Sequence, residues 1–206
     1  MASEINAQRV ERRLDRLLAE YGDVPVEEQT WEGSDEEFEG FADSARDGYL
    51  GGAYAWVVRE PADAPPLTES MPEEANGDAR RALMIRNRAD EGWSLPGGGR
   101  EDDETFEAAA RREVREETGV DCSVGEPFLL RRVTAVPDDG VEGASADAVH
   151  LLYAFFDATY EGGSIAIQPA ELHGAAWFAD PPERLLPATE RRAEAWNPDA
   201  GAAPRE

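Results

Sequence analysis

Three glutamates near the middle of the chain, Glu113, Glu116 and Glu117, have a spacing that can support chemistry. They fall in the segment 103–118, whose pattern predicts a helix with successive side chains about 100° apart. Taking Phe106 as the reference direction, Glu113 and Glu117 point within about 40° of it, and Glu116 lies slightly to one side. The carboxylates therefore share the apolar side of the predicted helix, where a solvated acidic face would not lie.

Such a group of carboxylates is unfavourable unless a positive charge neutralises it. Acids at positions i, i+3 and i+4 repel one another, and the partial negative charge of the helix C-terminus lies beside them. A divalent cation removes this repulsion, and oxygen ligands suit Mg²⁺ or Mn²⁺. Because the segment contains neither His nor Cys, zinc is disfavoured. We therefore predict a Mg²⁺ or Mn²⁺ site on this helix.

Three glycines, Gly97, Gly98 and Gly99, precede the predicted helix. Glycine-rich turns at helix starts bring bare backbone close to a ligand and commonly bind phosphate. A tight turn between a strand and the helix would explain the same residues without a ligand. Our hypothesis is that these glycines bind substrate, with the turn as the alternative.

Taken together, these residues resemble the Nudix hydrolase family, whose box runs G-x5-E-x7-R-E-U-x-E-E-x-G-U, where U is a bulky aliphatic residue. Every position of the box is filled here by Gly98, Glu104, Arg112, Glu113, Val114, Glu116, Glu117, Gly119 and Val120. The resemblance covers roughly residues 48–187. It implies an α/β (α+β) fold, a Nudix-like α/β/α sandwich with a mixed β-sheet.

The resemblance further implies an enzyme in which water attacks a phosphorus atom of a diphosphate bridge in a nucleoside diphosphate derivative. Glu113, Glu116 and Glu117 would bind the metal ions, with Glu104 as an auxiliary ligand. Arg112 would orient these carboxylates, since it lies one helical turn before Glu116. Metal ions suit this reaction because they stabilise charge on phosphoryl oxygens and lower the pKa of the attacking water.

The box alone leaves the general base open. Family members use either a glutamate of the box, here Glu113, or one from a later loop, here Glu171, six residues before Trp177. Glu171 can equally be an ordinary exposed residue, because a base requires a geometry that the sequence does not show. Of the two histidines, His150 lies among strand residues, which is typical of a structural role, and His173 is near the same loop.

Substrate choice depends on residues outside the box. In the family, a proline about sixteen positions beyond the box accompanies ADP-ribose enzymes, and Pro137 lies seventeen beyond it. This favours ADP-ribose or a similar nucleotide sugar slightly, although a simple turn explains Pro137 as well. Trp93, Tyr54 and Phe178 can either stack on a base or belong to the core.

A second hypothesis of a different class is a sensor that keeps the Nudix fold and binds a nucleotide without turnover. The box has lost none of its acids, and the sequence shows no helix-turn-helix segment. Both observations favour the enzyme.

Charge and composition restrict the partners of the protein. The chain has 45 acidic residues and 20 basic ones, all of them Arg, and a net charge of -25. This predicts a salt-adapted protein, since near-molar salt shortens the Debye length to about 3 Å and screens the repulsion between carboxylates. So acidic a surface disfavours nucleic-acid polymers and anionic membranes as partners. The resemblance to the Nudix family implies a small nucleotide as the partner. A single cysteine and the absence of a signal-like or membrane-spanning run predict a cytoplasmic location.

We expect three parts along the chain. Residues 1–47 would form an amphipathic helix ending near Gly22, followed by an acidic connector of uncertain structure. Residues 48–187 would form the Nudix hydrolase domain, and residues 188–206 a C-terminal tail. The apolar stripe of the first helix would pack on the main domain or on a second copy, which would make a homodimer.

Strands alternate unevenly with helices in the central part. We predict strands over 50–59, 81–88, 127–136, 148–160, 164–168 and 175–178, a surface loop over 60–79 and a short helix after Pro182. This order indicates a mixed sheet with helices on both faces.

Overall fold

The structure is a computed structural model that describes residues 4–64, 79–101, 103–138 and 147–200. Most of the predicted loop 60–79 and the end of the predicted tail therefore lie outside the described residues. None of the described helices is long and apolar enough to cross a membrane.

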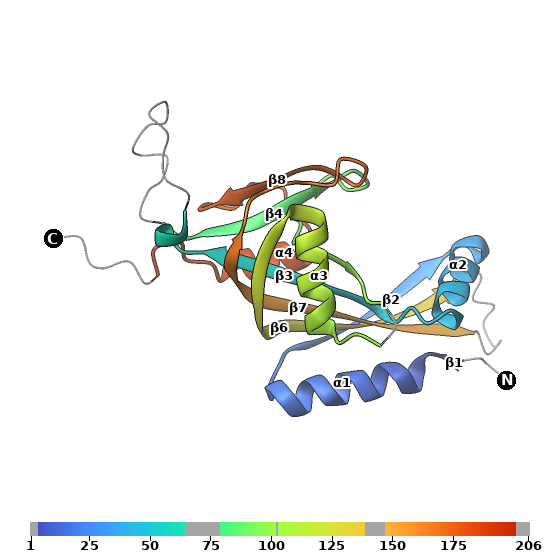
Figure 1. Ribbon diagram of the computed structural model, residues 1–206. Coiled ribbons are helices and arrows are strands. Elements are labelled where there is room, and N and C mark those ends of the chain that lie inside the picture. Colours follow the sequence, from blue (N-terminus) through green and yellow to red (C-terminus); the bar gives the residue numbers. More distant parts are fainter. Residues whose placement is uncertain (1–3, 65–78, 102, 139–146, 201–206) are drawn as a thin grey trace. The chain divides into compact units, whose positions relative to one another are not determined.

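A mixed β-sheet is the central element (Figure 1). Its strands are β1 (Glu4–Ile5), β2 (Val26–Gly33), β3 (Gly51–Arg59), β4 (Arg81–Asn87), β5 (Gly97–Gly99), β6 (Val120–Pro137), β7 (Ala148–Gly163) and β8 (Leu172–Phe178). The strand order is β2-β6-β7-β3-β4-β8, with β1 paired to β7 and β5 paired to β3. Because β2 runs parallel to β6 and β8 antiparallel to β4, the sheet is mixed, as predicted.

In the part of the chain that the structure describes, four α-helices accompany the sheet: α1 (Ala7–Tyr21), α2 (Asp35–Arg46), α3 (Phe106–Thr118) and α4 (Pro187–Glu194), with a short 3₁₀ helix, η1 (Pro61–Asp63). Helix α1 confirms the amphipathic helix expected from the periodic apolar residues, and its Val10, Leu14 and Leu17 are buried. The α/β (α+β) fold class is confirmed by this arrangement.

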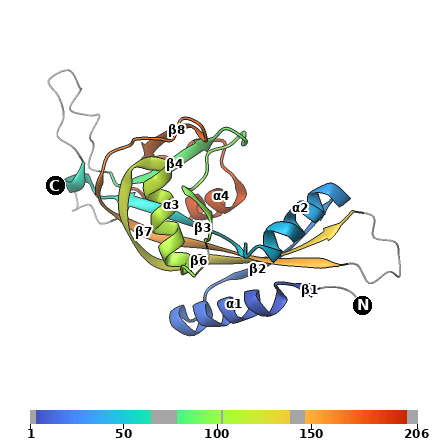
Figure 2. The ribbon, with the colours of Figure 1, turned by 45° about the vertical axis from the view of Figure 1, so that its right-hand side comes forward.

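The acidic connector after the first helix is more regular than the sequence suggested. Residues 26–46 form β2 and α2, and Figure 2 shows α2 beside β2 and β6. Ser34 and Glu37 form a capping box that satisfies backbone N–H groups at the start of α2. The helix then buries Phe38 and Ala42 against strand residues such as Val133. Few apolar residues suffice here because they all lie on one side of the helix.

The predicted strand over 164–168 is wrong, because no regular element forms there. Its backbone N–H groups donate instead to the end of α3: Ala166 to the carbonyl of Thr118 at 2.8 Å and Gln168 to that of Glu117 at 3.4 Å. The last carbonyls of a helix have no partner within the helix. The segment therefore serves as a cap for α3 rather than as a strand of the sheet.

The chain groups into two compact units, each with its own core. The first takes its described residues from 1–54, 98–110 and 126–156, and its core includes the residues that α2 covers. The second takes its described residues from 55–97, 111–125 and 157–206. In the second unit, the ring of Trp56 packs on that of Trp196 with the ring centroids 5.5 Å apart.

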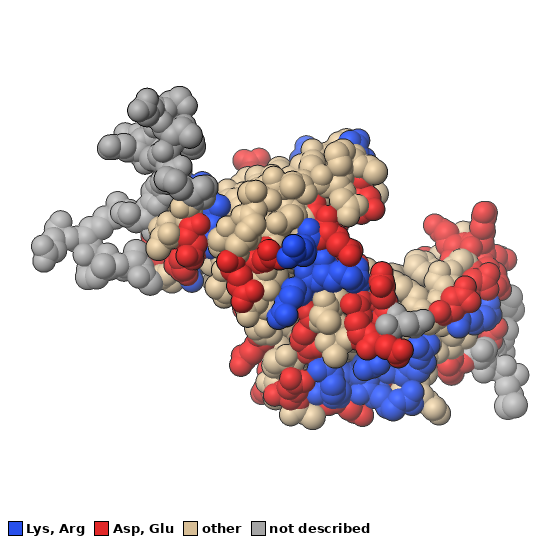
Figure 3. Space-filling view, viewed as in Figure 1, with Lys and Arg blue, Asp and Glu red and all other residues tan. Residues whose placement is uncertain are grey.

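The surface carries the expected excess of acids. Figure 3 shows carboxylates spread over much of one face, with arginine side chains gathered over α1 and α3. Both helices are rich in Arg between their apolar residues.

Candidate functional site

Helix α3 places its acidic residues at three different depths. Its buried side is formed by Phe106, Ala109, Ala110 and Val114, all fully buried. Glu117 is on the same side and is only 6% exposed. Glu113 is half-buried and Glu116 is exposed. The prediction that these carboxylates share the apolar side of the helix is thus confirmed for Glu117 and in part for Glu113. Glu116 instead points to solvent.

The pKa of Glu117 is strongly perturbed. Burial raises its pKa, the hydrogen bond from the Gly97 N–H lowers it, and the charges of Glu113 and Glu171 raise it further, to about 8. The N–H of Gly97 donates to Oε2 of Glu117 at 2.8 Å. Since desolvation and two like charges act on one carboxylate, the site favours either a proton or a cation there.

Arg112 joins the other two carboxylates of the helix. Its Nη1 donates to Oε1 of Glu113 at 2.9 Å and to Oε2 of Glu116 at 3.1 Å. The contact with Glu116 spans one helical turn, as the spacing predicts. Arg112 therefore contacts both carboxylates, and its role in orienting them stays a prediction.

The loop before β8 places Glu171 close enough for its charge to act on Glu117. Nε2 of Gln168 donates to the carbonyl of Glu116 at 3.0 Å, which attaches the loop to the end of α3. The N–H of Glu171 donates to the carbonyl of Gln168 at 3.1 Å, and its carbonyl accepts from the N–H of Arg88 at 3.0 Å. The backbone of Glu171 is therefore held on both sides.

Gln168 is a residue of this region that the sequence reasoning missed. Its contact with Glu116 joins residues 52 positions apart. No periodicity or motif marks it, and the only general signal is that the end of α3 needs donors for its carbonyls.

Gly119 has a structural reason for its place in the box. It follows α3 with a φ of 73°, and its N–H donates to the carbonyl of Arg115 at 2.8 Å. A Cβ on this residue would lie 2.8 Å from the carbonyl oxygen of Ser164. Only glycine combines this left-handed conformation with the close approach of the capping segment.

The glycines of β5 have contacts that explain them in part without a ligand. Gly97 donates to Glu117, as described above. A Cβ on Gly52 would lie 2.5 Å from the carbonyl oxygen of Gly98. A Cβ on Gly99 would lie 3.2 Å from the ring of Tyr49. Close packing therefore requires glycine at Gly52 and favours it at Gly99, and substrate binding by the three glycines stays a prediction.

Glu104 lies just before α3, in a turn held by a buried arginine. Arg100 is 4% exposed, and its Nη1 donates to the carbonyls of Glu101 at 2.6 Å and Glu104 at 2.8 Å. Oε1 of Glu104 accepts from the N–H of Glu101 at 2.7 Å. Arg100 is a second residue that the sequence reasoning missed, although an arginine directly after three glycines was visible in the sequence.

The histidines have separate surroundings. Nε2 of His150 contacts the carboxylate of Glu4, and its Nδ1 lies 3.5 Å from Oγ1 of Thr134, which supports a structural role. His173 is exposed on β8, two residues beyond Glu171.

The aromatic residues and the proline considered for the substrate have protein partners. The rings of Trp93 and Phe178 meet edge to face with centroids 4.8 Å apart. Tyr54 stacks on Phe155 at 5.2 Å. Pro137 ends β6 and pairs with β2. These contacts give each of the four residues a structural role, and contact with a substrate stays a prediction.

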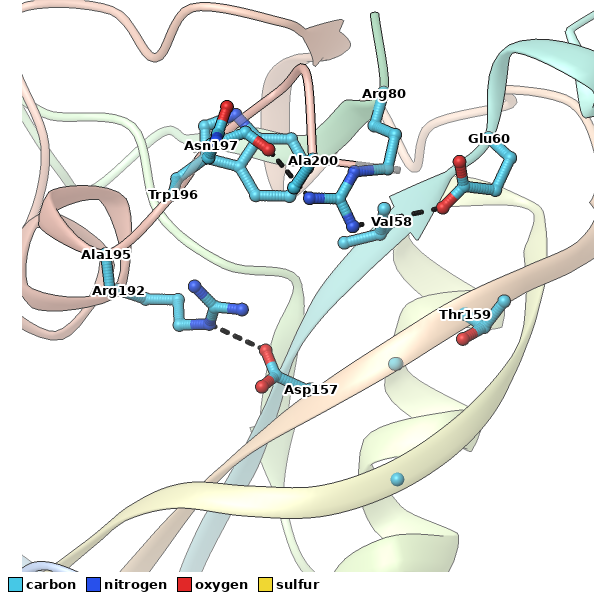
Figure 4. Close-up of a pocket in the computed structure, with 12 residues that line it drawn as sticks. Val58, Glu60, Arg80, Asp157, Thr159, Arg192, Ala195, Trp196, Asn197 and Ala200 are labelled. Carbon is cyan, nitrogen blue, oxygen red and sulfur yellow. Dashed lines mark hydrogen bonds and ion pairs between the residues drawn. The ribbon is translucent and has the colours of Figure 1, made fainter. Parts of the chain in front are cut away.

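A cavity of about 380 Å³ lies in the second unit (Figure 4). None of the candidate metal ligands lines it. Strand β8 gives the distance between the cavity and the carboxylates. It begins at Leu172, next to Glu171, and ends at Phe178, which pairs with Ala82 of β4, two residues after Arg80. These ends are about 20 Å apart, at roughly 3.3 Å per residue. Both arginines of the cavity are engaged: Arg80 donates to the carbonyl of Asn197 and Arg192 to Asp157, each at 2.7 Å.

Within the described residues, no group of three or more His, Cys, Asp or Glu side chains is arranged to hold a metal. Glu113 and Glu116 are turned to Arg112, and Glu117 to Gly97. Their oxygen-only donor set nevertheless fits Mg²⁺ or Mn²⁺. The raised pKa of Glu117 supports this fit, because a cation would offset the desolvation and repulsion that raise it.

Comparison with known proteins identifies the family. A model of the NUDIX domain matches residues 75–198, more than half of the chain. The NAD-capped RNA hydrolase NudC of Haemophilus influenzae is 37% identical over 87 residues, which cover 42% of this chain and only 28% of NudC. The nucleoside triphosphatase NudI of an Enterobacter species is 30% identical over 105 residues, covering 46% of this chain and 70% of NudI.

Solved structures include a MutT NUDIX hydrolase from Burkholderia pseudomallei, which is 23% identical and has a TM-score of 0.42. That match covers 70% of this chain and 95% of the other. The box and the match to the domain model agree. The chain belongs to the NUDIX domain family.

Proposed function

We propose that the protein is a Mg²⁺-dependent pyrophosphohydrolase that cleaves the diphosphate linkage of a nucleoside diphosphate derivative. The observation that carries this proposal is the state of Glu117, which is buried and subject to the charges of Glu113 and Glu171. A structural role alone gives no reason to bury an acid beside two others, whereas metal binding does.

Glu113, Glu116 and Glu117 would hold the metal, with Glu104 as a further ligand. Arg112 would keep Glu113 and Glu116 oriented toward one another, since it already contacts both. When bound, the metal would supply charge stabilisation on the phosphoryl oxygens and lower the pKa of the attacking water. The N–H of Gly97 would fix the rotamer of Glu117 by the hydrogen bond described above.

Glu171 is our candidate for the general base that accepts the proton of the attacking water. The alternative, Glu113, accepts a hydrogen bond from Arg112 at 2.9 Å, so one of its oxygens is already engaged. Glu171 has a backbone fixed by Gln168 and Arg88 and a side chain that is exposed. It can therefore receive and release a proton without breaking an ion pair with Arg112.

For the substrate, we retain the slight preference for ADP-ribose or a similar nucleotide sugar that Pro137 suggested. The relatives named above are a NAD-capped RNA hydrolase and a nucleoside triphosphatase, so NAD, capped RNA and nucleoside triphosphates are the competing substrates. We place the enzyme in the cytoplasm and expect small nucleotides rather than nucleic-acid polymers as partners, because of the net charge of -25.

A substrate panel tests this proposal. It should contain ADP-ribose, nucleotide sugars, NAD, capped RNA and nucleoside triphosphates, at high KCl with Mg²⁺ or Mn²⁺. We expect metal-dependent release of a nucleoside monophosphate or pyrophosphate, lost in Glu117→Gln and retained in Glu126→Gln, an exposed control on β6. Full activity in Glu117→Gln would refute the metal site. Binding of a nucleotide without turnover by the wild-type protein would favour the sensor.

A further inference from the structure

Helix α1 lies outside the residues that match the NUDIX domain, yet it is part of the first unit. The match begins at residue 75, whereas α1 spans Ala7–Tyr21. Its Val10 and Leu17 are 1% and 0% exposed. The apolar side of α1 is thus already covered within this chain, and the helix has the fixed position that a supporting element requires.

The end of α1 contacts the first turn of α3 through Glu107. Nη1 and Nη2 of Arg16 donate to Oε1 and Oε2 of Glu107, each at 3.0 Å. The hydroxyl of Tyr21 donates to Oε1 of the same carboxylate at 3.2 Å. Two side chains of α1 therefore hold both oxygens of one acid on α3, and a bidentate contact of this kind fixes direction as well as distance.

The surroundings of this contact are partly desolvated. The side chains of Arg16 and Glu107 are 32% and 20% exposed. Burial raises the pKa of Glu107, but the hydrogen bonds from Arg16 hold it below its usual value. Burial and the charge of Glu107 raise the pKa of Tyr21 to about 12, so the phenol remains a donor. Glu20 also contacts Arg16, at 2.7 Å, from within α1.

The ion pair of Arg16 and Glu107 fixes the orientation of α3 more than it stabilises the fold. Removing an arginine and a carboxylate from water costs about as much free energy as their attraction returns, so an apolar pair would stabilise the docking of α1 equally well. An apolar pair, however, would not fix the rotation and tilt of α3. Glu113 and Glu117 lie six and ten residues beyond Glu107 on this one helix, which corresponds to about 9 and 15 Å along its axis.

We propose that Arg16, with Tyr21, is a positioning residue for the candidate metal ligands, acting through Glu107 and the rigid body of α3. The proposal rests on the function proposed above for Glu113 and Glu117. A tilt of about 5° at Glu107 would displace the end of α3 by about 1 Å, and displacements of that size are large for metal and substrate geometry.

The test compares Arg16→Gln and Glu107→Gln with a matched control, Arg131→Gln. Arg131 makes a similar two-nitrogen contact with Glu27, in the same unit, and its side chain is 18% exposed. Three properties are measured on the full chain: amide exchange of residues 106–118, Mn²⁺ binding by electron paramagnetic resonance without substrate, and the separate values of kcat and KM.

We expect faster amide exchange along α3 and a dissociation constant for Mn²⁺ that is about 3- to 10-fold higher in both variants, but not in the control. With an active substrate, kcat should fall while KM changes little, because the altered geometry is that of the reacting centre. Arg16→Lys, which keeps the charge but not the two-nitrogen contact, should recover only part of the loss.

Two results would overturn the proposal. One is unchanged exchange along α3 in both variants. The other is faster exchange with Mn²⁺ affinity and kcat equal to those of the control, which would make the pair merely structural. The test is separable from the proposed function, since a wild-type protein that hydrolyses nothing would refute the enzyme, whereas amide exchange and Mn²⁺ binding would still decide the role of Arg16.

Discussion

Replacing Glu117 with Gln should stabilise the metal-free protein while abolishing its activity. The carboxylate is 6% exposed and accepts a hydrogen bond from the Gly97 N–H. Gln has nearly the same shape, and its side-chain oxygen can accept the same bond. The substitution therefore removes the charge and leaves the packing in place.

The expected gain in stability of Glu117→Gln follows from the pKa of Glu117, which is about 8 in the folded protein against 4.5 for the free group. Between these values the folded state holds the proton and the unfolded state has lost it, so the stability of the wild-type protein falls as pH rises. This loss in the free energy of unfolding is small near pH 4, about 3 kcal/mol at pH 7 and about 5 kcal/mol above pH 8. Glu117→Gln should remove this loss.

Urea unfolding in the presence of a chelator measures this effect. The free energy of unfolding is compared between Glu117→Gln, the wild-type protein and the exposed control Glu126→Gln at several pH values from 5 to 9. We expect the advantage of Glu117→Gln to grow with pH and the control to show none. Saturating Mg²⁺ should reduce the advantage, because only the wild-type protein gains a bound cation.

A difference in stability that does not depend on pH would refute the reasoning. It would mean that the charge of Glu117 is not desolvated in the folded protein. A loss of stability in Glu117→Gln at high pH would be equally decisive, since it would show that the carboxylate already has a favourable partner in the absence of metal.

Three other predictions concern the loop, the cap of α3 and the surface. Glu171→Gln should lower kcat by about 10²-fold or more with little change in the Mg²⁺ concentration for half-maximal activity; a shift of the metal requirement alone, in a Mg²⁺ titration, would make Glu171 a ligand instead. Gly119→Ala should destabilise the protein by at least about 1 kcal/mol in urea unfolding, because alanine disfavours the left-handed conformation; unchanged stability would contradict the close approach to Ser164. Since the net charge is -25, the thermal midpoint should rise with KCl toward molar concentrations; a flat or falling midpoint would count against salt adaptation.

The fold was predictable wherever the pattern is local. The periodic apolar residues Val10, Leu14 and Leu17 predicted α1, and they are buried. Residues 26–46 were not predicted because they are largely polar, although the capping box formed by Ser34 and Glu37 is a signal visible in the sequence. The segment 164–168 was assigned to a strand because extended strands and extended caps have the same local pattern, and only their hydrogen-bond partners differ.

The candidate site was predictable in its chemistry and only partly in its geometry. Helical spacing placed Glu117 on the buried side and linked Arg112 to Glu116, and both features are found. Gln168 and Arg100 were missed, since the first acts on a residue 52 positions away and the second is distinguished by its burial.

By itself, the sequence indicated the class of chemistry. The helical spacing of Glu113, Glu116 and Glu117 predicts a cation site, and that prediction needs only the geometry of the helix. Tertiary structure decided which of them is out of water, that the charge of Glu171 acts on Glu117, and that Arg16 holds α3 at Glu107. Desolvation and Coulomb interactions depend on neighbours that are close in space, and these neighbours lie far from α3 in the sequence.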